Sequence, residues 1–171
     1  MREAELSMER RRGASENDIL ISQSNRANAF QKLGQFEQAN SMLRDVYSGW
    51  LNFKGEESQN TLIAANNYAA SLNSLKRFEE ARSLLRKTMP VARRVLGEGN
   101  EITLKMRKSY AGSLVLDNGA TLDDLREGIT TLEDAEQIGR RVLGGAHPLV
   151  RDIELSLRKS RGALGDHEMR A

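Results

Sequence analysis

The side chains best suited to chemistry in this sequence are amides that recur at a fixed spacing. Asn25 and Asn67 occupy the same position of a 42-residue repeat, and Ser109 occupies that position in the next copy. A carboxamide both donates and accepts hydrogen bonds, so it can pair with polar groups of either kind. Repeated amides and hydroxyls of this sort favour binding, because no nucleophile or general base is spaced to act with them.

No pattern in the sequence predicts catalysis. The two histidines, His147 and His167, have no His, Glu or Cys partner at the spacing of a metal site, and the chain has no cysteine. The glycine clusters at 97–99 and 144–145 lack the Gly-Lys-Ser/Thr sequence that would make a phosphate-binding loop. We therefore expect no enzyme activity, no catalytic residue, no metal and no cofactor.

The elements that must position the recurring amides are two amphipathic helices repeated along the chain. Residues 63–75 and 78–96 both carry apolar side chains at helical spacing, with a short break at Lys76-Arg77. Neither helix can bury its apolar stripe alone, so such units must stack on copies of themselves. A 42-residue shift brings the preceding block into register, matching Ile21 with Ile63, Ala27 with Ala69, Leu33 with Leu75, Phe36 with Phe78, Ala39 with Ala81, Leu43 with Leu85 and Gly55 with Gly97.

The repeat predicts an all-α fold, an α-solenoid of antiparallel helix pairs in one domain over residues 1–164. The interval from Gly97 to Gly144 is longer than the 42-residue interval from Gly55 to Gly97, so we expect a five-residue insertion in the turn at 117–121. Arg158 and Arg161 stand where earlier copies have apolar residues, as expected of a helix that closes the stack. The predicted units are repeat one at 13–55, repeat two at 56–97, repeat three at 98–144, a capping helix at 147–164 and a tail at 165–171.

Residues 1–12 have two interpretations. The 42-residue register aligns Gly13 with Gly55, which predicts that 1–12 is the last part of a second-type helix from a preceding repeat. In that case an open edge would leave Leu6 and Met8 poorly covered. The alternative is a disordered charged leader.

Composition narrows the class of protein. Aromatic residues make up only 5% of the chain and there are two prolines, a profile that favours packed helices over a β-sandwich. The net charge of +2 is a weaker basic bias than nucleic-acid binders usually show. No apolar run approaches the roughly 20 residues of a membrane span, and no signal-peptide core follows the first residue. We expect a cytoplasmic protein with no membrane insertion and no nucleic-acid partner.

The repeated positions resemble the tetratricopeptide repeat, and in particular the 42-residue type of kinesin light chains. The small residue of the first helix matches Ala27, Ala69 and Ala111, and the alanine of the second helix matches Ala39 and Ala81. The likeness to kinesin light chains in particular comes from three sequence segments, 66–69, 78–86 and 143–148. The resemblance covers about 13–164.

This resemblance implies a right-handed stack whose concave groove is lined by the first helix of each pair. Family members hold extended peptides or a partner's helix there, which predicts a non-catalytic protein–protein interaction module. Lysines in repeat three would favour a partner with an acidic segment. Exposed Asn and Lys can also be mere solvated surface. The groove residues that the resemblance implies are Ser24, Asn25, Asn28, Asn66, Asn67, Asn73, Lys105, Lys108 and Ser109.

Two other functions remain open at this point. The chain could be a structural subunit that docks edge-on into a larger assembly, or a homo-oligomer that associates through its open N-terminal edge. Nucleic-acid binding through the arginine pairs 93–94 and 140–141 is the third hypothesis, although those pairs also suit the negative ends of helices.

Overall fold

The computed structural model describes residues 15–169, which form seven helices and short connections. Residues 1–14 and 170–171 lie outside the described part, so the two interpretations of 1–12 stay untested, as does the exposure of Leu6 and Met8. The helices are α2 (Glu16–Lys32), α3 (Phe36–Lys54), α4 (Gln59–Ser74), α5 (Phe78–Leu96), α6 (Glu101–Val115), α7 (Leu122–Leu143) and α8 (Pro148–Glu168).

Local sequence signals explain where the helices begin. Ser15 caps α2 and Thr121 caps α7, and each forms a reciprocal capping box with an aspartate three residues later. These boxes satisfy amide groups that have no partner inside the helix. A Ser or Thr followed three residues later by an acidic residue is a sequence signal for a helix start, and α2 and α7 both begin at such a signal.

Glycine marks the ends of the second helices. Gly55, Gly97 and Gly144 follow α3, α5 and α7, with φ angles of 80°, 93° and 87°. This backbone conformation is strained for residues with a Cβ, which explains why glycine recurs there.

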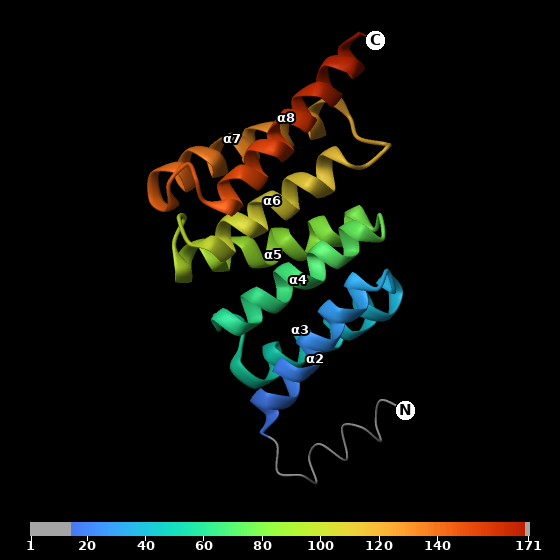
Figure 1. Cartoon of the computed structure of the whole chain (residues 1–171), viewed down its shortest axis with the longest axis vertical. Helices are drawn as coiled ribbons and strands as arrows, with labels where there is room; N and C mark the ends of the chain where they lie inside the picture. Colours follow the sequence, from blue (N-terminus) through green and yellow to red (C-terminus); the bar gives the residue numbers. More distant parts are fainter. Residues whose placement is uncertain (1–14, 170–171) are drawn as a thin grey trace.

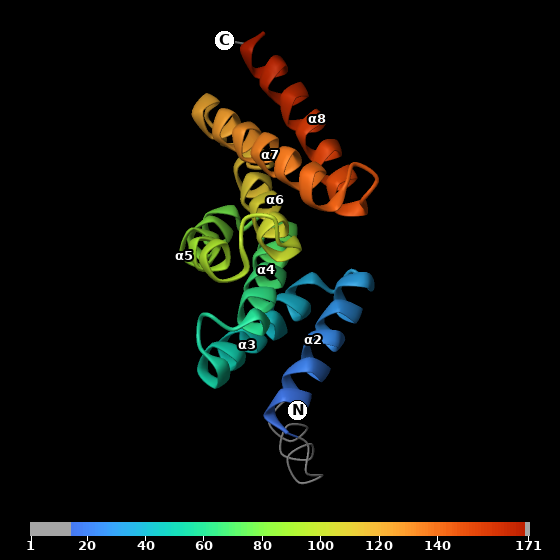
Figure 2. The ribbon, with the colours of Figure 1, turned by 90° about the vertical axis from the view of Figure 1, so that its left-hand side faces the viewer.

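The helices pair and stack into a solenoid. α2 packs on α3, α4 on α5 and α6 on α7, and each second helix packs on the first helix of the next pair. Figure 1 shows the pairs following one another along the long axis, with α8 at the C-terminal end. In Figure 2 α5 lies to the left of α4 and α6, and α2 and α8 lie to the right. The prediction of an all-α solenoid of helix pairs is confirmed.

Small residues allow the helices to approach closely. Ala27, Ala69 and Ala111 are completely buried, as are Ala39 and Ala81. In repeat three, Gly128 stands where the other copies have alanine, because a Cβ there would lie 2.6 Å from a methyl group of Val115. The helix register deduced from the sequence thus matches the packing. Larger apolar side chains fill the layers between the small ones; the main cluster contains Leu62, Leu85, Met106, Tyr110 and Leu114.

The extra residues of repeat three are not all in the turn. Six residues, 116–121, join α6 to α7, whereas three residues, 75–77, join α4 to α5. α7 has 22 residues and α5 has 19, whereas α6 has 15 and α4 has 16, so the longer turn and the longer second helix together account for the five extra residues. The connection between α6 and α7 contains the expected turn at 117–121, and the extra residues are shared between this turn and α7. Arg82 holds the longer turn by donating to the Ser113 carbonyl oxygen at 2.8 Å and pairing with Asp117 at 3.3 Å.

The C-terminal helix is longer than expected. The sequence predicts a capping helix that ends at residue 164 and a tail from 165, but α8 continues to Glu168. Gly165 is therefore helical and does not end the element. Arg158 and Arg161 point their charges outward as predicted, since both are exposed and Arg161 pairs with Glu133 at 2.6 Å. None of the helices in residues 15–169 combines the length and apolar character that a membrane crossing needs.

Candidate functional site on the inner face

We call the surface formed by α2, α4, α6 and α8 the inner face. It has hollows at two places, one between α2 and α4 and one between α4, α6 and α8. α4 packs directly on α6, and α6 on α8, whereas α2 makes few contacts with α4. The first helices are therefore in looser contact at the α2 end of the inner face than at its α8 end.

Three of the expected groove amides are free to bind. Asn25 and Asn28 are exposed on α2, and Asn67 is partly exposed on α4. None of the three has a hydrogen-bond partner within residues 15–169. The hollow between α2 and α4, of about 120 Å³, combines amides with apolar side chains. Its walls include Ile21, Ser24, Asn25, Asn60 and Ile63.

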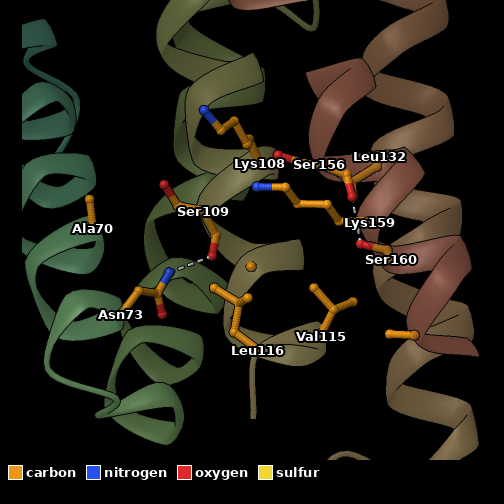
Figure 3. A pocket seen from close by; sticks show the side chains of 12 residues that line it. Ala70, Asn73, Lys108, Ser109, Val115, Leu116, Leu132, Ser156, Lys159 and Ser160 are labelled. Atoms are coloured by element: carbon orange, nitrogen blue, oxygen red, sulfur yellow. Dashed lines mark hydrogen bonds between the residues drawn. The ribbon is translucent and has the colours of Figure 1, made fainter. Parts of the chain in front are cut away.

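Two other expected groove amides are occupied by contacts between helices. Asn66 is only 9% exposed and accepts a hydrogen bond of 3.2 Å from the Ser109 hydroxyl. Asn73 donates through Nδ2 to the Ser109 carbonyl oxygen at 2.8 Å, a bond visible in Figure 3. Asn66, Asn73 and Ser109 thus tie α4 to α6. Asn66 Oδ1 and Asn73 Nδ2 are therefore already engaged in bonds between helices.

The larger hollow lies between α4, α6 and α8, and we call it the α6–α8 pocket. Its volume is about 380 Å³. Figure 3 shows Lys159 reaching from α8 toward α6, with Val115 and Leu116 at the other end of the pocket. Three residues expected from sequence, Asn73, Lys108 and Ser109, are among its walls. The lining residues are Ala70, Asn73, Lys108, Ser109, Gly112, Val115, Leu116, Leu132, Ser156, Lys159, Ser160 and Ala163.

The expected lysines of α6 already have ion-pair partners. Lys105 pairs with Glu101 at 3.3 Å, and Lys108 pairs with Asp152 of α8 at 3.1 Å. Lys159 is exposed and forms no ion pair with any residue in 15–169. The free positive charge at this end of the inner face therefore belongs to Lys159, which was not among the expected site residues.

The expected site residues include none from α8, because the sequence pattern predicts only a capping role for this helix. The same shift that relates Gly97 to Gly144 aligns Ser109 with Ser156. It also aligns Gly112 with Lys159. Carrying the register one helix further would therefore have placed both α8 residues on the inner face.

The arginines at the ends of the second helices are held by acidic side chains. Arg94 pairs with Glu57 at 2.7 Å, and Arg93 pairs with Glu98 at 2.6 Å. Glu98 also pairs with the buried Arg107. Partial burial acts to raise the pKa of Glu98, but the two arginines outweigh it and lower that pKa below its usual value. These ion pairs link the end of α5 to the connection before α4 and, through Glu98, to α6.

The inner face offers hydrogen-bonding amides, the charged Lys159 and apolar side chains. Within residues 15–169, no three His, Cys, Asp or Glu side chains gather as a metal site would require. His147 caps α8, its Nδ1 accepting from the Leu149 amide at 3.3 Å.

Comparisons with known proteins agree with this architecture. Residues 18–94 match the model of the tetratricopeptide repeat family. Among solved structures, the crystal structure of BtubC (BKLC) from P. vanneervenii superposes with a TM-score of 0.74 at 16% sequence identity. The match covers 91% of this chain and 60% of the BtubC chain, so this chain spans a little over half of that protein's length. A comparison with curated proteins gave no match.

The family match indicates tetratricopeptide repeats in residues 18–94, and the likeness to BtubC shows that the two chains share a fold. Repeats of this family mediate protein–protein interaction or scaffolding and are typically not catalytic.

Proposed function

We propose that this protein is a non-catalytic interaction module that holds a peptide or helix of a partner protein on its inner face. The observation that carries the proposal is the set of free amides at the α2 end. Asn25, Asn28 and Asn67 lie on the two helices that border the more open part of the face, and no described residue uses their hydrogen-bonding groups. Amides can pair with a partner's backbone whatever its side chains are.

The same face supports a preference for an acidic partner segment at its α8 end. In the sequence, Lys105 and Lys108 suggest this preference, but both pair with neighbouring carboxylates. Lys159 is the better basis for it, because its ammonium group is exposed and has no ion-pair partner within residues 15–169. A carboxylate beside Lys159 would gain a charge-assisted hydrogen bond.

The test is a capture experiment with matched asparagine variants. Wild-type protein, the Asn25→Ala/Asn67→Ala double variant and an Asn52→Ala control are used as baits in lysate from the source organism. Asn52 is exposed on α3, away from the inner face, and its amide has no partner within 15–169. We expect a partner that the wild type and the control retain and the double variant loses. A partner retained equally by all three baits would contradict the proposal.

One observation favours the alternative of a structural subunit that docks edge-on. Phe36 is 43% exposed at the start of α3, whereas Phe78 at the equivalent position of α5 is 8% exposed. Leu33 beside it is 72% exposed. A partner that survives the asparagine double variant but is lost from a Phe36→Ser variant would favour docking through the turn between α2 and α3.

A further inference from the structure

The side of α8 that faces away from α7 carries a line of exposed residues. We call the surface formed by Arg151, Leu155, Arg158 and Gly162 the end face. These residues are four, three and four positions apart, so they follow one another along a single side of the helix. The opposite side of α8 is buried against α7 through residues such as Ile153 and Leu157. Figure 1 shows α8 at the C-terminal end of the stack.

The repeat register shows what packs at the equivalent positions of α6. The shift that relates Gly97 to Gly144 aligns Leu104 with Arg151, Ala111 with Arg158 and Val115 with Gly162. Leu104 and Ala111 pack with residues of α7 in one apolar cluster, and Val115 lies where a Cβ on Gly128 of α7 would overlap it. The end face is therefore the side of α8 on which the second helix of a further pair would lie. Because its residues are exposed, no helix of residues 15–169 takes this place.

The two arginines of the end face have no neutralising partner. Most arginines in residues 15–169 pair with a carboxylate. Glu154 is the only acidic residue three or four positions from Arg151 or Arg158, the spacing at which side chains of a helix meet. Glu154 pairs instead with Arg140 of α7. Two positive charges therefore remain on the end face without an ion pair in the described part of the chain.

Solubility alone does not explain the end face. A helix that closes a stack needs a polar outer side, but Leu155 is 47% exposed between the two arginines. Gly162 lies inside α8, where glycine costs about 1 kcal/mol of helix stability relative to alanine. A Cβ built on Gly162 meets nothing within 4 Å, so another backbone can approach closely there. An exposed leucine and an open glycine beside unpaired arginines suit a surface that another helix covers.

The spacing of the arginines specifies the helix that would fit. Arg151 and Arg158 are seven positions apart, which is about 10 Å along α8. A partner helix that lies antiparallel to α8 matches them when it has two acidic residues seven positions apart. An apolar residue between the acidic ones then contacts Leu155. Each guanidinium group can bind a carboxylate through two parallel hydrogen bonds.

Acidic residues around the end face favour a protein helix over a nucleic acid. Asp152 follows Arg151 directly, and Glu154 lies between the two arginines. A nucleic acid carries a negative charge on every nucleotide, so part of its backbone would lie against these carboxylates. A helix can place its acidic residues opposite the arginines alone.

We infer that the end face docks a helix of a partner protein that has two acidic residues seven positions apart and an apolar residue between them. The helix takes the place that a second helix of a further pair would occupy, and Arg151 and Arg158 select its charges. This surface is separate from the inner face, so the inference goes beyond the proposed function and does not depend on it.

The experiment selects helices on the full chain. A phage library displays alanine-based helices of about five turns with the residues of one side randomised. Selection is carried out on the wild type, on Arg151→Glu/Arg158→Glu, and on a Lys87→Glu/Arg141→Glu control. Lys87 on α5 and Arg141 on α7 are exposed and have no ion pair in residues 15–169, so the control makes the same change in net charge away from the end face. Thermal melting followed by circular dichroism shows that each variant is folded, and fluorescence anisotropy measures the dissociation constants of enriched helices.

We expect the wild type and the control to enrich helices with two acidic residues seven positions apart and an apolar residue between them. Arg151→Glu/Arg158→Glu should bind these helices about tenfold or more weakly, because two ion pairs are replaced by two repulsions. It should also bind versions with lysine in place of the acidic residues more tightly than the wild type does. Equal affinities for the wild type and the folded arginine variant would overturn the inference, as would selection that yields no acidic pair.

Two further measurements separate other occupants of the end face. Light scattering without any peptide tests whether the wild type forms a dimer that Arg151→Glu/Arg158→Glu does not form. Such a result would replace the partner helix by a second copy of the chain. Anisotropy of a labelled single-stranded oligonucleotide tests the other anionic ligand. Oligonucleotide binding that the arginine variant loses, with no helix enriched, would also overturn the inference.

The Asn25→Ala/Asn67→Ala variant separates this inference from the proposed function. Helices that lose affinity for the asparagine variant but bind Arg151→Glu/Arg158→Glu as tightly as the wild type lie on the inner face. That result would support the proposed function and overturn the inference. Loss of affinity in the arginine variant alone would support the inference and place the enriched helices on the end face.

Discussion

Asparagines at repeated positions serve two different purposes in this protein. Asn66 and Asn73 bond to Ser109 across the boundary between α4 and α6. Asn25 and Asn67 have no partner within residues 15–169. The same residue type therefore stabilises one part of the inner face and leaves hydrogen-bonding capacity free in another.

This difference predicts opposite outcomes for two matched double variants. Asn66→Ala/Asn73→Ala should lower the free energy of unfolding by about 1–2 kcal/mol, because two hydrogen bonds between helices are lost. The decrease in the free energy of unfolding stays this small because Asn73 Oδ1 is buried without a partner in residues 15–169. Removing this oxygen therefore breaks no hydrogen bond. Asn25→Ala/Asn67→Ala should change the stability by no more than about 0.5 kcal/mol.

Urea unfolding of both variants and the wild type measures the two free energies. Equal destabilisation by the two pairs would show that the hydrogen bonds to Ser109 contribute nothing to holding α4 against α6.

At the scale of the element, the start of α7 depends on one capping box. The Thr121 hydroxyl accepts from the Asp124 amide at 3.1 Å and donates to the Asp124 carboxylate at 2.7 Å. The hydrogen bonds from the Thr121 side chain and backbone lower the pKa of Asp124 below its usual 3.8. Thr121→Ala should cost about 1 kcal/mol at neutral pH.

The pH dependence follows from the direction of this shift. Because the folded pKa of Asp124 is lowered, its stabilisation is fully present above the unfolded value and is lost as the pH falls through the folded value. The difference in stability between wild type and Thr121→Ala should therefore shrink in acid. Urea unfolding at neutral and acidic pH measures it, with Thr130→Ala, an exposed position on the same helix, as the control. A difference that stays constant with pH would contradict the role of the Asp124 carboxylate.

The elements were predictable because their signals are local and repeated. Apolar spacing, Ser15 and Thr121 as caps, and Gly55 and Gly97 as stops indicate the helices and their order. The position of the extra residues in repeat three was not predictable, since a longer α7 and a longer turn both give the same distance from Gly97 to Gly144. The end of α8 was misplaced because glycine inside a helix is tolerated when neighbouring turns are stable.

The site was only partly predictable for a related reason. Repeat register places a residue on the inner face, but it does not say whether a neighbouring helix already uses its polar groups. Asn67 and Asn73 belong to the same helix, yet Asn73 is bonded to Ser109 and Asn67 is not. Lys159 was overlooked because the last helix was assigned a capping role alone. Such distinctions depend on distances between helices that are far apart in the sequence.

At the scale of the whole molecule, the solenoid presents a continuous face built from α2, α4, α6 and α8. Firm packing of α4, α6 and α8 fixes the pocket at one end. The looser spacing of α2 and α4 exposes free amides at the other end. A partner segment lying along the face would contact the free amides at its α2 end and the α6–α8 pocket at its α8 end.

The central claim is that a partner lies on this face, and the most direct test is a footprint of the bound state by nuclear magnetic resonance. Side-chain amide signals of Asn25, Asn28 and Asn67 and the backbone signal of Gly112 are followed while a peptide from the partner captured by the wild type is added. The account predicts that these signals shift together, and that the signal of Asn52 on α3 does not. Shifts confined to the second helices or to the turn between α2 and α3 would contradict it.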